Sequence, residues 1–471
     1  MQYGANPVGT GGSASNTQGH ADPVKPFLPG SQSLKHRSRH PGVCLHTAMP
    51  DTARTLVVMG QGYVGLPLAM RAVAAGFEVV GYEPAADRAA RLAAGHSYVE
   101  DVTSSELAAA LATGRYLATK DPAGCADFDV AVITVPTPLR EGVPDLSYIE
   151  SAAAVLAIHL RPGATVVLES TTYPGTTEEL VKPLLEAGSG LVAGRDFHLG
   201  YSPERIDPGN PVWRFENTPK VVSGIDAASA EAVDGFYSAI VERTVVVSST
   251  GVAELTKLLE NTFRHVNIAL VNELAMFAAD LDIDVWEAID AASTKPFGYL
   301  RFTPGPGVGG HCLPIDPSYL SWRVRRRLGQ SFRFVELAND INDHMPDYVV
   351  RRVGLALNAR RRAISGSTVL LLGLAYKKNT GDAREAPGAV IAEQLLALGA
   401  EVRAADPYVG DGHVDSRVVR VEATPAEIAN ADIVVTVTDH DCFDMTEVVG
   451  HARLVLDTRH ACPDAATVER L

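Results

Sequence analysis

Two segments near opposite ends of the 471-residue chain follow the same pattern of residue types. Each begins with an apolar run that ends in glycine, at residues 55–60 and 368–373, and continues through a turn into a helix-forming stretch. A second apolar run then ends in an acidic residue before proline, at Glu83 and at Asp406. Continuous apolar strands that alternate with helices are typical of parallel sheets covered on both faces. The repeat therefore predicts an α/β fold with two doubly wound parallel-sheet domains.

The chain between the two repeats is predicted to be helical. From residue 252 to about residue 281 no strong breaker occurs, and apolar residues recur at intervals of three and four. Such a helix would be roughly 45 Å long at a rise of about 1.5 Å per residue. An apolar face favours a homodimer or a higher homo-oligomer, although burial within one subunit would explain the same pattern. We expect two Rossmann-like domains joined by this long central helix, divided into a disordered tail at 1–50, a cofactor-binding Rossmann domain at 51–248, a central helical and dimerisation domain at 249–345, and a second Rossmann-like domain at 346–471.

The composition argues against several kinds of partner and site. A net charge of −15 disfavours nonspecific binding to nucleic acid or to an anionic membrane, and no apolar run is long enough to span a bilayer. The five cysteines are widely spaced and form no CxxC motif, so we expect no metal site and no disulfide framework, as in a protein of the cytoplasm. Residues 1–50 lack the apolar segment of a signal peptide and are predicted to be disordered, and Met49 is a candidate for the true start.

A glycine-rich turn in the first domain indicates a dinucleotide site. An apolar run and a helix-forming stretch flank the sequence Gly60-Gln61-Gly62-Tyr63-Val64-Gly65, which matches the GxGxxG pattern. The first glycine makes the turn, the second lets the backbone approach a pyrophosphate, and the third permits close packing. Glu83 would accept hydrogen bonds from the ribose and repel a 2′-phosphate, so we expect NAD rather than NADP; Arg88 weakens this preference only slightly. A glycine turn without a ligand is the alternative.

Polar residues also end two later strands of the first domain. Ligands in open α/β sheets lie beyond the carboxyl ends of the strands, so these side chains are candidates for contacts with phosphate, ribose or nicotinamide. A role as a helix N-cap explains each of these threonines about as well as ligand binding does, and Thr176 or Thr177 is the best candidate for such a cap. The candidates for cofactor binding are Thr134, Pro136, Thr137, Thr171 and Glu178.

A second glycine-rich loop, at residues 304–310, precedes Cys312, and Asp316 follows four residues later. A thiol there can act as a nucleophile while neighbouring amides stabilise an oxyanion, although a buried core cysteine is the alternative. Adjacent side chains normally point apart, so we expect His311 to be a packing or loop residue and not the base.

Two further polar residues lie on one face of the predicted central helix. Lys257 and Asn261 are four residues apart in an otherwise rather apolar segment, where a solvated charged face is the alternative. Glu204 follows another short strand.

Together these segments resemble the UDP-glucose/GDP-mannose dehydrogenase family, from residue 55 to the C-terminus. The resemblance implies oxidation of the C6 alcohol of a nucleotide-diphosphate sugar to a carboxylate with two NAD, and a C-terminal domain that binds the nucleotide. Residues 201–210, 295–299 and 311–317 resemble most the branch that acts on a UDP-N-acetylhexosamine, UDP-GlcNAc or UDP-ManNAc, while UDP-glucose and dTDP-glucose remain alternatives. The motifs that carry the resemblance are 60–65, 135–138, 202–204, 257–261, 309–316 and 377–385.

The resemblance also implies roles for individual residues. Cys312 is the expected nucleophile, and Arg384 is expected to reach the cofactor from the C-terminal domain. The other expected catalytic residues are Lys257, Asn261, Asp316, Glu204 and Thr171. The residues expected to contact the substrate are Glu204, Arg205, Lys257, Asn261, Phe297, Tyr299, Gly309 and Lys377.

The chemistry of such a reaction suits these residue types. One hydride transfer gives an aldehyde, a thiolate then forms a thiohemiacetal, its oxidation gives a thioester, and water cleaves the thioester. Lys257 would stabilise the alkoxide and lower the pKa of the thiol. Either Asp316 or Glu204 would position or deprotonate the water.

The chain departs from the family pattern at three places. Many relatives have Asp at the position of Glu83 and Ser at that of Ala386, and Arg301 is only a candidate for the arginine that some relatives supply across the dimer interface. A one-step NAD dehydrogenase or epimerase would explain the glycine turn, but neither Cys312 nor the second sheet domain. Only the intact set of polar residues argues against a noncatalytic nucleotide sensor.

Overall fold

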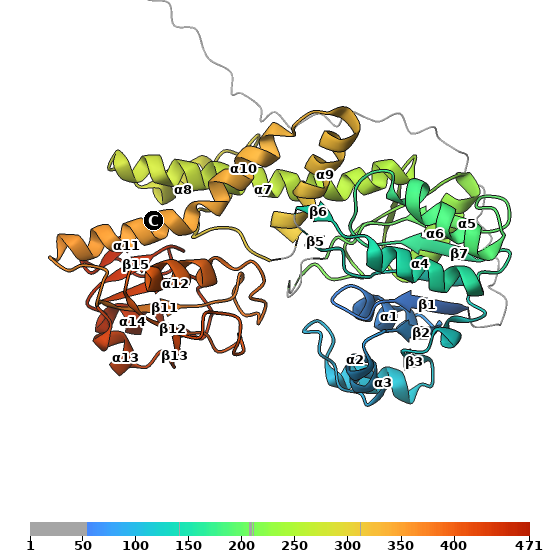
Figure 1. Cartoon of the computed structure of the whole chain (residues 1–471), viewed down its shortest axis with the longest axis horizontal. Coiled ribbons are helices and arrows are strands. Elements are labelled where there is room, and N and C mark those ends of the chain that lie inside the picture. Colours follow the sequence, from blue (N-terminus) through green and yellow to red (C-terminus); the bar gives the residue numbers. More distant parts are fainter. Residues whose placement is uncertain (1–53, 141, 207–209, 211, 311) are drawn as a thin grey trace, which may run out of the picture. The chain divides into compact units, whose positions relative to one another are not determined.

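A computed structural model describes residues 54–140, 142–206, 210, 212–310 and 312–471 (Figure 1). For Cys312 and Pro314 it describes the backbone alone. The predicted tail at 1–50, the candidate start at Met49 and the loop residue His311 lie outside the described residues.

The first sheet domain has β1 (Thr55–Met59) at the centre of an eight-stranded sheet with the order β10-β9-β8-β7-β4-β1-β2-β3. Its described neighbours all pair in parallel except β8 and β9. The strand order reverses between β1 and β4, where a doubly wound sheet holds its ligand. The other strands are β2 (Glu78–Tyr82), β3 (Tyr116–Thr119), β4 (Val130–Ile133), β7 (Thr165–Leu168), β8 (His198–Tyr201), β9 (Lys220–Gly224) and β10 (Thr244–Val246).

Helices cover both faces of this sheet. Alternate residues of β1 lie in different cores: Leu56 and Val58 pack in a cluster with α1 and α6, whereas Val57 and Met59 pack in a cluster with α4 and α5. This division is the reason that the strand is apolar throughout. The remaining elements are α1 (Gly65–Ala74), α2 (Ala86–Ala93), α3 (Ser104–Ala112), η1 (Pro122–Cys125), the hairpin β5 (Leu139–Arg140) and β6 (Val143–Pro144), α4 (Ser147–His159), η2 (Thr177–Val181), α5 (Lys182–Ser189) and α6 (Ala227–Tyr237).

The second sheet domain repeats this plan on six parallel strands, in the order β13-β12-β11-β14-β15-β16. Here too the order reverses beside the first strand, between β11 and β14. Val369 and Leu371 of β11 pack with α11 and α12, and Leu370 and Leu372 pack with α13 and α14. The elements are α11 (Met345–Ala359), β11 (Thr368–Leu372), α12 (Pro387–Ala397), β12 (Glu401–Ala405), β13 (Val419–Arg420), α13 (Pro425–Asn430), β14 (Ile433–Thr436), α14 (Met445–His451), β15 (Val455–Asp457) and β16 (Val468–Arg470).

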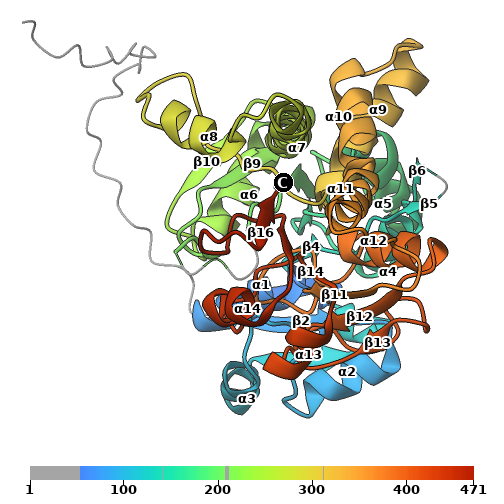
Figure 2. The ribbon, with the colours of Figure 1, turned by 90° about the vertical axis from the view of Figure 1, so that its left-hand side faces the viewer.

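The predicted long helix is α7 (Thr250–Asp280), with 31 residues. The side chain of Ser249 caps its start by accepting a hydrogen bond from the amide of Val252. The helix packs against α9 (Cys312–Leu328) and α10 (Arg333–Asp343), which Figure 2 shows beside α7 in a view almost along the helix axis. A shorter helix, α8 (Val285–Ser293), follows it. The two sheet domains and this helix confirm the fold class predicted from the sequence.

None of the helices in the described part of the chain combines the length and the apolar character that crossing a membrane requires.

Candidate active site

The glycine turn after β1 has the geometry of a dinucleotide loop. Gly60 has a φ of +93°, and a Cβ on Gly65 would lie 1.9 Å from the carbonyl oxygen of Gly60, so only glycine fits at these two positions. Gly62 is different, because the nearest heavy atom to a Cβ there, in Arg88, is 4.0 Å away. In the described part of the chain no side chain caps the start of α1, at Val64, so the positive end of the helix dipole is left for an anion. Within the first turn the Leu66 amide already donates to the carbonyl of Gly62 at 3.1 Å, and Pro67 has no N–H.

Glu83 lies beside this turn, directly after β2. Its carboxylate is 4% exposed and accepts hydrogen bonds from the amides of Gln61 at 3.3 Å and Ala85 at 3.2 Å. The guanidinium of Arg88 lies 3.6 Å from the same carboxylate and 4.7 Å from the ring centroid of Tyr98. Arg88 is therefore held at Glu83, where it neutralises the carboxylate.

The polar residues at the other strand ends do not all face a ligand. The hydroxyl of Thr134 donates to the carbonyls of Met59 and Gly60, at 3.0 and 2.9 Å, and so fixes the glycine turn to the end of β4. Thr137 is buried, and its carbonyl accepts a hydrogen bond from the Tyr319 hydroxyl at 2.7 Å. Pro136 is exposed.

The loop after β7 is fixed by the central helix. Thr171 in this loop is half-buried, and the exposed Glu178 accepts a hydrogen bond from the Thr250 hydroxyl at 2.7 Å. The capping alternative for Thr176 and Thr177 is wrong: η2 starts after Thr176 without a side-chain cap, and the Thr176 hydroxyl donates to the carbonyl of Tyr173. The Thr177 hydroxyl donates to a carboxylate of α7.

That carboxylate belongs to Glu254, which the sequence analysis did not single out. It also accepts hydrogen bonds from the amides of Gly175 at 2.6 Å and Thr177 at 2.9 Å. Burial raises the pKa of Glu254 to about 7, although these hydrogen bonds lower it. A signal was present in the sequence, since Glu254 lies three residues before Lys257 and hence on the same face of the helix.

The structure brings together three residues predicted to be catalytic. Lys257 and Asp316 are 8% and 1% exposed, and the Asn261 amide donates to the Asp316 carboxylate at 2.5 Å. Burial raises the pKa of Asp316 to about 6, even though the charge of Lys257 and the hydrogen bond from Asn261 lower it. Asp316 is four residues after the first residue of α9, Cys312, so helical geometry puts both positions on one face. The side chain of Cys312 itself is outside the described residues.

Glu204 and Arg205 follow β8. Glu204 is 7% exposed and accepts a hydrogen bond from the Ile206 amide at 2.5 Å. Arg205 forms an ion pair of 2.6 Å with Glu260, the residue before Asn261 on α7. Burial, followed by the charges of Glu254, Asp316, Glu169 and Glu204, raises the pKa of the fully buried Tyr201 well above its ordinary value. Asp316 and Glu204, the two candidates for water activation, therefore both raise the pKa of the same buried tyrosine.

The glycine-rich loop at 304–310 packs against the second sheet domain. The amide of Gly310 donates to the carbonyl of Arg384 at 2.9 Å. A Cβ on Gly310 would lie 2.9 Å from the ring of Tyr376, and one on Gly309 would lie 2.7 Å from the carbonyl oxygen of Glu385. Glycine is therefore required here for packing against the chain, and not only for access of a substrate.

Candidates from the second sheet domain lie on the segment after β11. Lys377 is half-buried, and the exposed guanidinium of Arg384 binds the Asp382 carboxylate and lies 5.7 Å from the ring centroid of Tyr63 in the dinucleotide loop. Arg384 of the second sheet domain thus lies against Tyr63 of the first, and both were predicted to bind the cofactor.

The last two substrate candidates lie on the loop after α8, outside the buried cluster. Phe297 is 70% exposed with Lys295 against its ring, and Tyr299 is half-buried. Arg301 forms an ion pair of 2.7 Å with Asp290. Among the described residues, no group of three or more His, Cys, Asp or Glu side chains is placed to hold a metal ion.

Three family models match consecutive parts of the chain. They describe the NAD binding domain of the UDP-glucose/GDP-mannose dehydrogenase family at residues 54–241, its central domain at 251–344 and its UDP binding domain at 370–464. The cofactor of the first sheet domain is therefore NAD, as predicted.

Known relatives agree with these matches. The UDP-N-acetyl-D-mannosamine dehydrogenase of Pyrococcus horikoshii is 34% identical over 86% of this chain and 95% of its own. The UDP-N-acetyl-D-glucosamine 6-dehydrogenase of Pseudomonas aeruginosa is 38% identical over 75% and 83% of the two chains. The solved structure of the P. horikoshii UDP-D-ManNAc dehydrogenase matches with a TM-score of 0.80 at 33% identity, over 88% of this chain and 98% of that one. The chain therefore belongs to the UDP-glucose/GDP-mannose dehydrogenase family.

Proposed function

We propose that the protein is a cytoplasmic enzyme that oxidises the C6 alcohol of a UDP-N-acetylhexosamine to a carboxylate, with two NAD. The observation that carries the proposal is that Lys257 and Asn261 of α7 lie beside the buried carboxylate of Asp316, which follows Cys312 by one turn of α9. A one-step dehydrogenase needs no nucleophile, whereas a second oxidation at the same carbon needs a tetrahedral adduct of the aldehyde, which a thiolate can supply. The sugar class rests on the relatives, which are named for UDP-N-acetyl-D-mannosamine and UDP-N-acetyl-D-glucosamine.

The dinucleotide loop fits the cofactor. The open space at Gly62 admits the pyrophosphate to the backbone, the uncapped start of α1 presents the positive end of a helix dipole, and Glu83 supplies acceptors for the ribose. NAD supplies a hydride acceptor for each of the two oxidations. The guanidinium of Arg88 is already paired with the Glu83 carboxylate, so it has little attraction left for the 2′-phosphate of NADP.

The residues of the cluster have distinct tasks in the proposal. After the first oxidation, the Cys312 thiolate adds to the aldehyde carbon to give a thiohemiacetal, and Lys257 stabilises the oxygen that gains charge. Loss of a hydride from this adduct leaves a thioester. Water then attacks the thioester carbon, loses a proton to a carboxylate, and releases the carboxylic acid and the thiol.

We assign the deprotonation of the attacking water to Asp316 and not to Glu204. A general base works best when its pKa is near the working pH, and burial raises the pKa of Asp316 to about 6. The Asn261 amide fixes one oxygen of this carboxylate. Glu204 instead accepts a hydrogen bond from the next turn of its own loop, at the amide of Ile206.

We further propose that α7 joins two copies of the chain. Its exposed side carries apolar residues at intervals of three, four and seven, while Lys257 and Asn261 lie on the other side. Each buried leucine of such a stripe would contribute about 1.5–3 kcal/mol to association. The exposed residues are Val252, Leu255, Leu259, Phe263, Leu270, Leu274 and Phe277.

The substrate class is tested by supplying UDP-GlcNAc, UDP-ManNAc, UDP-glucose and dTDP-glucose separately with NAD. We expect two NADH per sugar and a uronic acid product, with the highest kcat/KM for one of the two N-acetylhexosamines. One NADH with an aldehyde or keto product would contradict the four-electron reaction. Highest kcat/KM for either glucose nucleotide would contradict the sugar class alone.

The role of Asp316 predicts a pH dependence. Protonated Asp316 cannot take a proton from water, so kcat should fall about tenfold per unit as the pH drops below about 6. Asp316→Asn should lower kcat by about 100-fold or more and abolish this acidic limb, measured from initial rates between pH 5 and 9. Asp464→Asn, at an ion pair with Arg470 in which the carboxylate side chain is 90% exposed, is the matched control and should keep both the kcat and the acidic limb. An unchanged acidic limb in Asp316→Asn would exclude Asp316 as the base.

The dimer predicts a mass of twice the 50.0 kDa chain in light scattering after gel filtration. Leu259→Glu, at a side chain that is 63% exposed, should give the monomer because it buries a charge in the interface. Leu117→Glu, at a 55% exposed position on β3, should remain a dimer. A monomeric wild type, or a dimeric Leu259→Glu, would refute this interface.

A further inference from the structure

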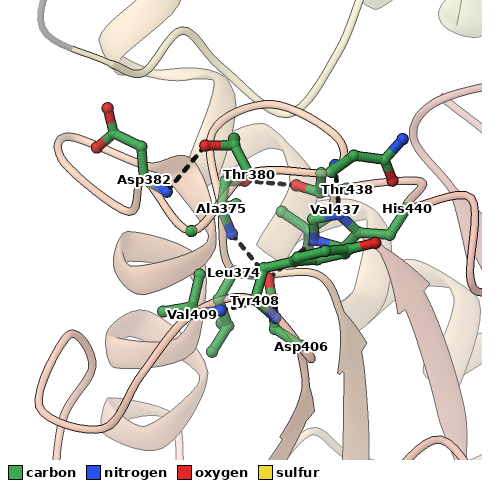
Figure 3. A network of polar contacts seen from close by, with 12 residues as sticks. Leu374, Ala375, Thr380, Asp382, Asp406, Tyr408, Val409, Val437, Thr438 and His440 are labelled. Atoms are coloured by element: carbon green, nitrogen blue, oxygen red, sulfur yellow. Dashed lines mark hydrogen bonds and ion pairs between the residues drawn. The ribbon is translucent and has the colours of Figure 1, made fainter. Parts of the chain in front are cut away.

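A buried histidine in the second sheet domain takes no part in the chemistry proposed above. His440 lies just beyond β14 and is 1% exposed (Figure 3). Its Nδ1 accepts a hydrogen bond from the Asn379 amide at 2.8 Å, and its Nε2 lies 2.9 Å from the Asp406 carboxylate. A backbone amide only donates, so Nδ1 carries no proton and the proton is on Nε2. The neutral ring therefore joins a carboxylate and a backbone amide from opposite edges.

Asp406 is the counterpart of Glu83 in the repeat, but its surroundings are closed. One oxygen accepts from the amides of Leu374 at 2.6 Å and Ala375 at 3.0 Å, and the other from Tyr408 at 2.8 Å and Val409 at 3.0 Å. Burial alone would raise the pKa of Asp406, but the hydrogen bonds from His440 and these amides hold it below its ordinary value. With five donors around two oxygens, this carboxylate is left with little capacity for a ribose.

These contacts act on one segment, residues 374–385, which we call the nucleotide loop. It starts at the two amides held by Asp406 and carries Lys377, expected to contact the substrate, and Arg384, expected to contact the cofactor. The Thr438 hydroxyl holds its second residue by donating to the carbonyl of Ala375 at 2.6 Å. The base of the loop is thus attached to the ends of both β12 and β14, the two neighbours of β11 (Figure 3).

The middle of the loop needs an external support. Asn379 has a φ of +59°, in the left-handed region that non-glycine residues seldom adopt. Its amide donates to His440, while its side chain exchanges hydrogen bonds with Asp441, at 2.6 Å to the carboxylate and 3.0 Å from the amide. The conformation two residues after Lys377 is therefore set by the segment that contains His440.

We propose that His440 is a positioning residue for the nucleotide of the substrate. Through Asp406 and Asn379 it fixes both ends of residues 374–379, and so places Lys377 toward the diphosphate. The inference rests on the proposed function, in that the ligand is taken to be a UDP-sugar. The same loop backs the glycine-rich segment before Cys312, because a Cβ on Gly310 would lie 2.9 Å from the ring of Tyr376.

The test is the affinity of the full-length protein for UDP, the probe, measured by calorimetry. His440→Asn keeps a polar atom near Nδ1 only, and His440→Gln keeps one near Nε2 only, so neither can join Asn379 to Asp406. Both variants should raise the Kd for UDP about tenfold. The Kd for NADH, which binds to the other sheet domain, should stay within about twofold of the wild type. The matched control His413→Asn, at an exposed position of the same domain, should change neither.

The outcomes separate the inference from the proposed function. Unchanged UDP affinity in both His440 variants would overturn the positioning role, and so would a parallel loss of UDP and NADH affinity, because that indicates general unfolding. A wild type that oxidises a UDP-sugar and shows the predicted losses supports the role. A wild type that fails to bind UDP would overturn the substrate class first, and this inference with it.

A second pair of variants tests the same role without altering the buried ring. Asn379 is exposed, so its replacement should not prevent folding. Asn379→Ala disfavours the left-handed conformation and should raise the Kd for UDP several-fold, whereas Asn379→Gly accepts that conformation and keeps the amide that binds His440. Equal UDP affinity for the alanine and glycine variants would count against the positioning role.

Discussion

A left-handed glycine at the end of the central strand determines where each sheet domain can hold a ligand. Gly60 and Gly373 make the same turn after β1 and β11, at the points where the strand order reverses. What differs is the acid from the next strand. Glu83 has two amide donors and remains beside an open turn, whereas Asp406 has four amides and His440. One turn thus serves a cofactor, and the other stabilises a loop.

The central helix connects these sites because its sides differ in chemistry. Its buried side presents Glu254, Lys257 and Asn261 at intervals of three and four, toward the loop after β7 and the start of α9. Its exposed side presents an apolar stripe. A rigid helix therefore couples the geometry of the reacting residues to the surface that we propose joins two subunits. Burial raises the pKa of Glu254 on this side of the helix and of Asp316 on the facing α9, although the partners of both carboxylates lower it.

The sequence was sufficient for the fold and for residues whose role depends on local spacing. The repeat at 55–83 and 368–406 predicted both sheets, and the spacing of Lys257 and Asn261 predicted a shared face. The sequence could not show which polar groups already have hydrogen-bond partners far along the chain. The Thr134 hydroxyl turns inward to residues 75 and 74 positions earlier, and His440 reaches Asp406 and Asn379 across 34 and 61 positions. Such contacts exist only once the sheets have formed, and the capping alternative failed at Thr177 for this reason, because its hydroxyl donates to Glu254. At Thr176 it failed through a local contact, with the carbonyl of Tyr173.

We propose that one thiol, Cys312, carries the sugar between the two oxidations while Asp316 activates water. The most direct measurement is the intact mass of Asp316→Asn mixed with NAD and the UDP-sugar that the wild type oxidises, followed by peptide mapping. We expect one substrate-sized covalent adduct per chain, located on Cys312 and released slowly. No adduct during turnover, or an adduct on any of the other four cysteines of the chain, would contradict this role of Cys312.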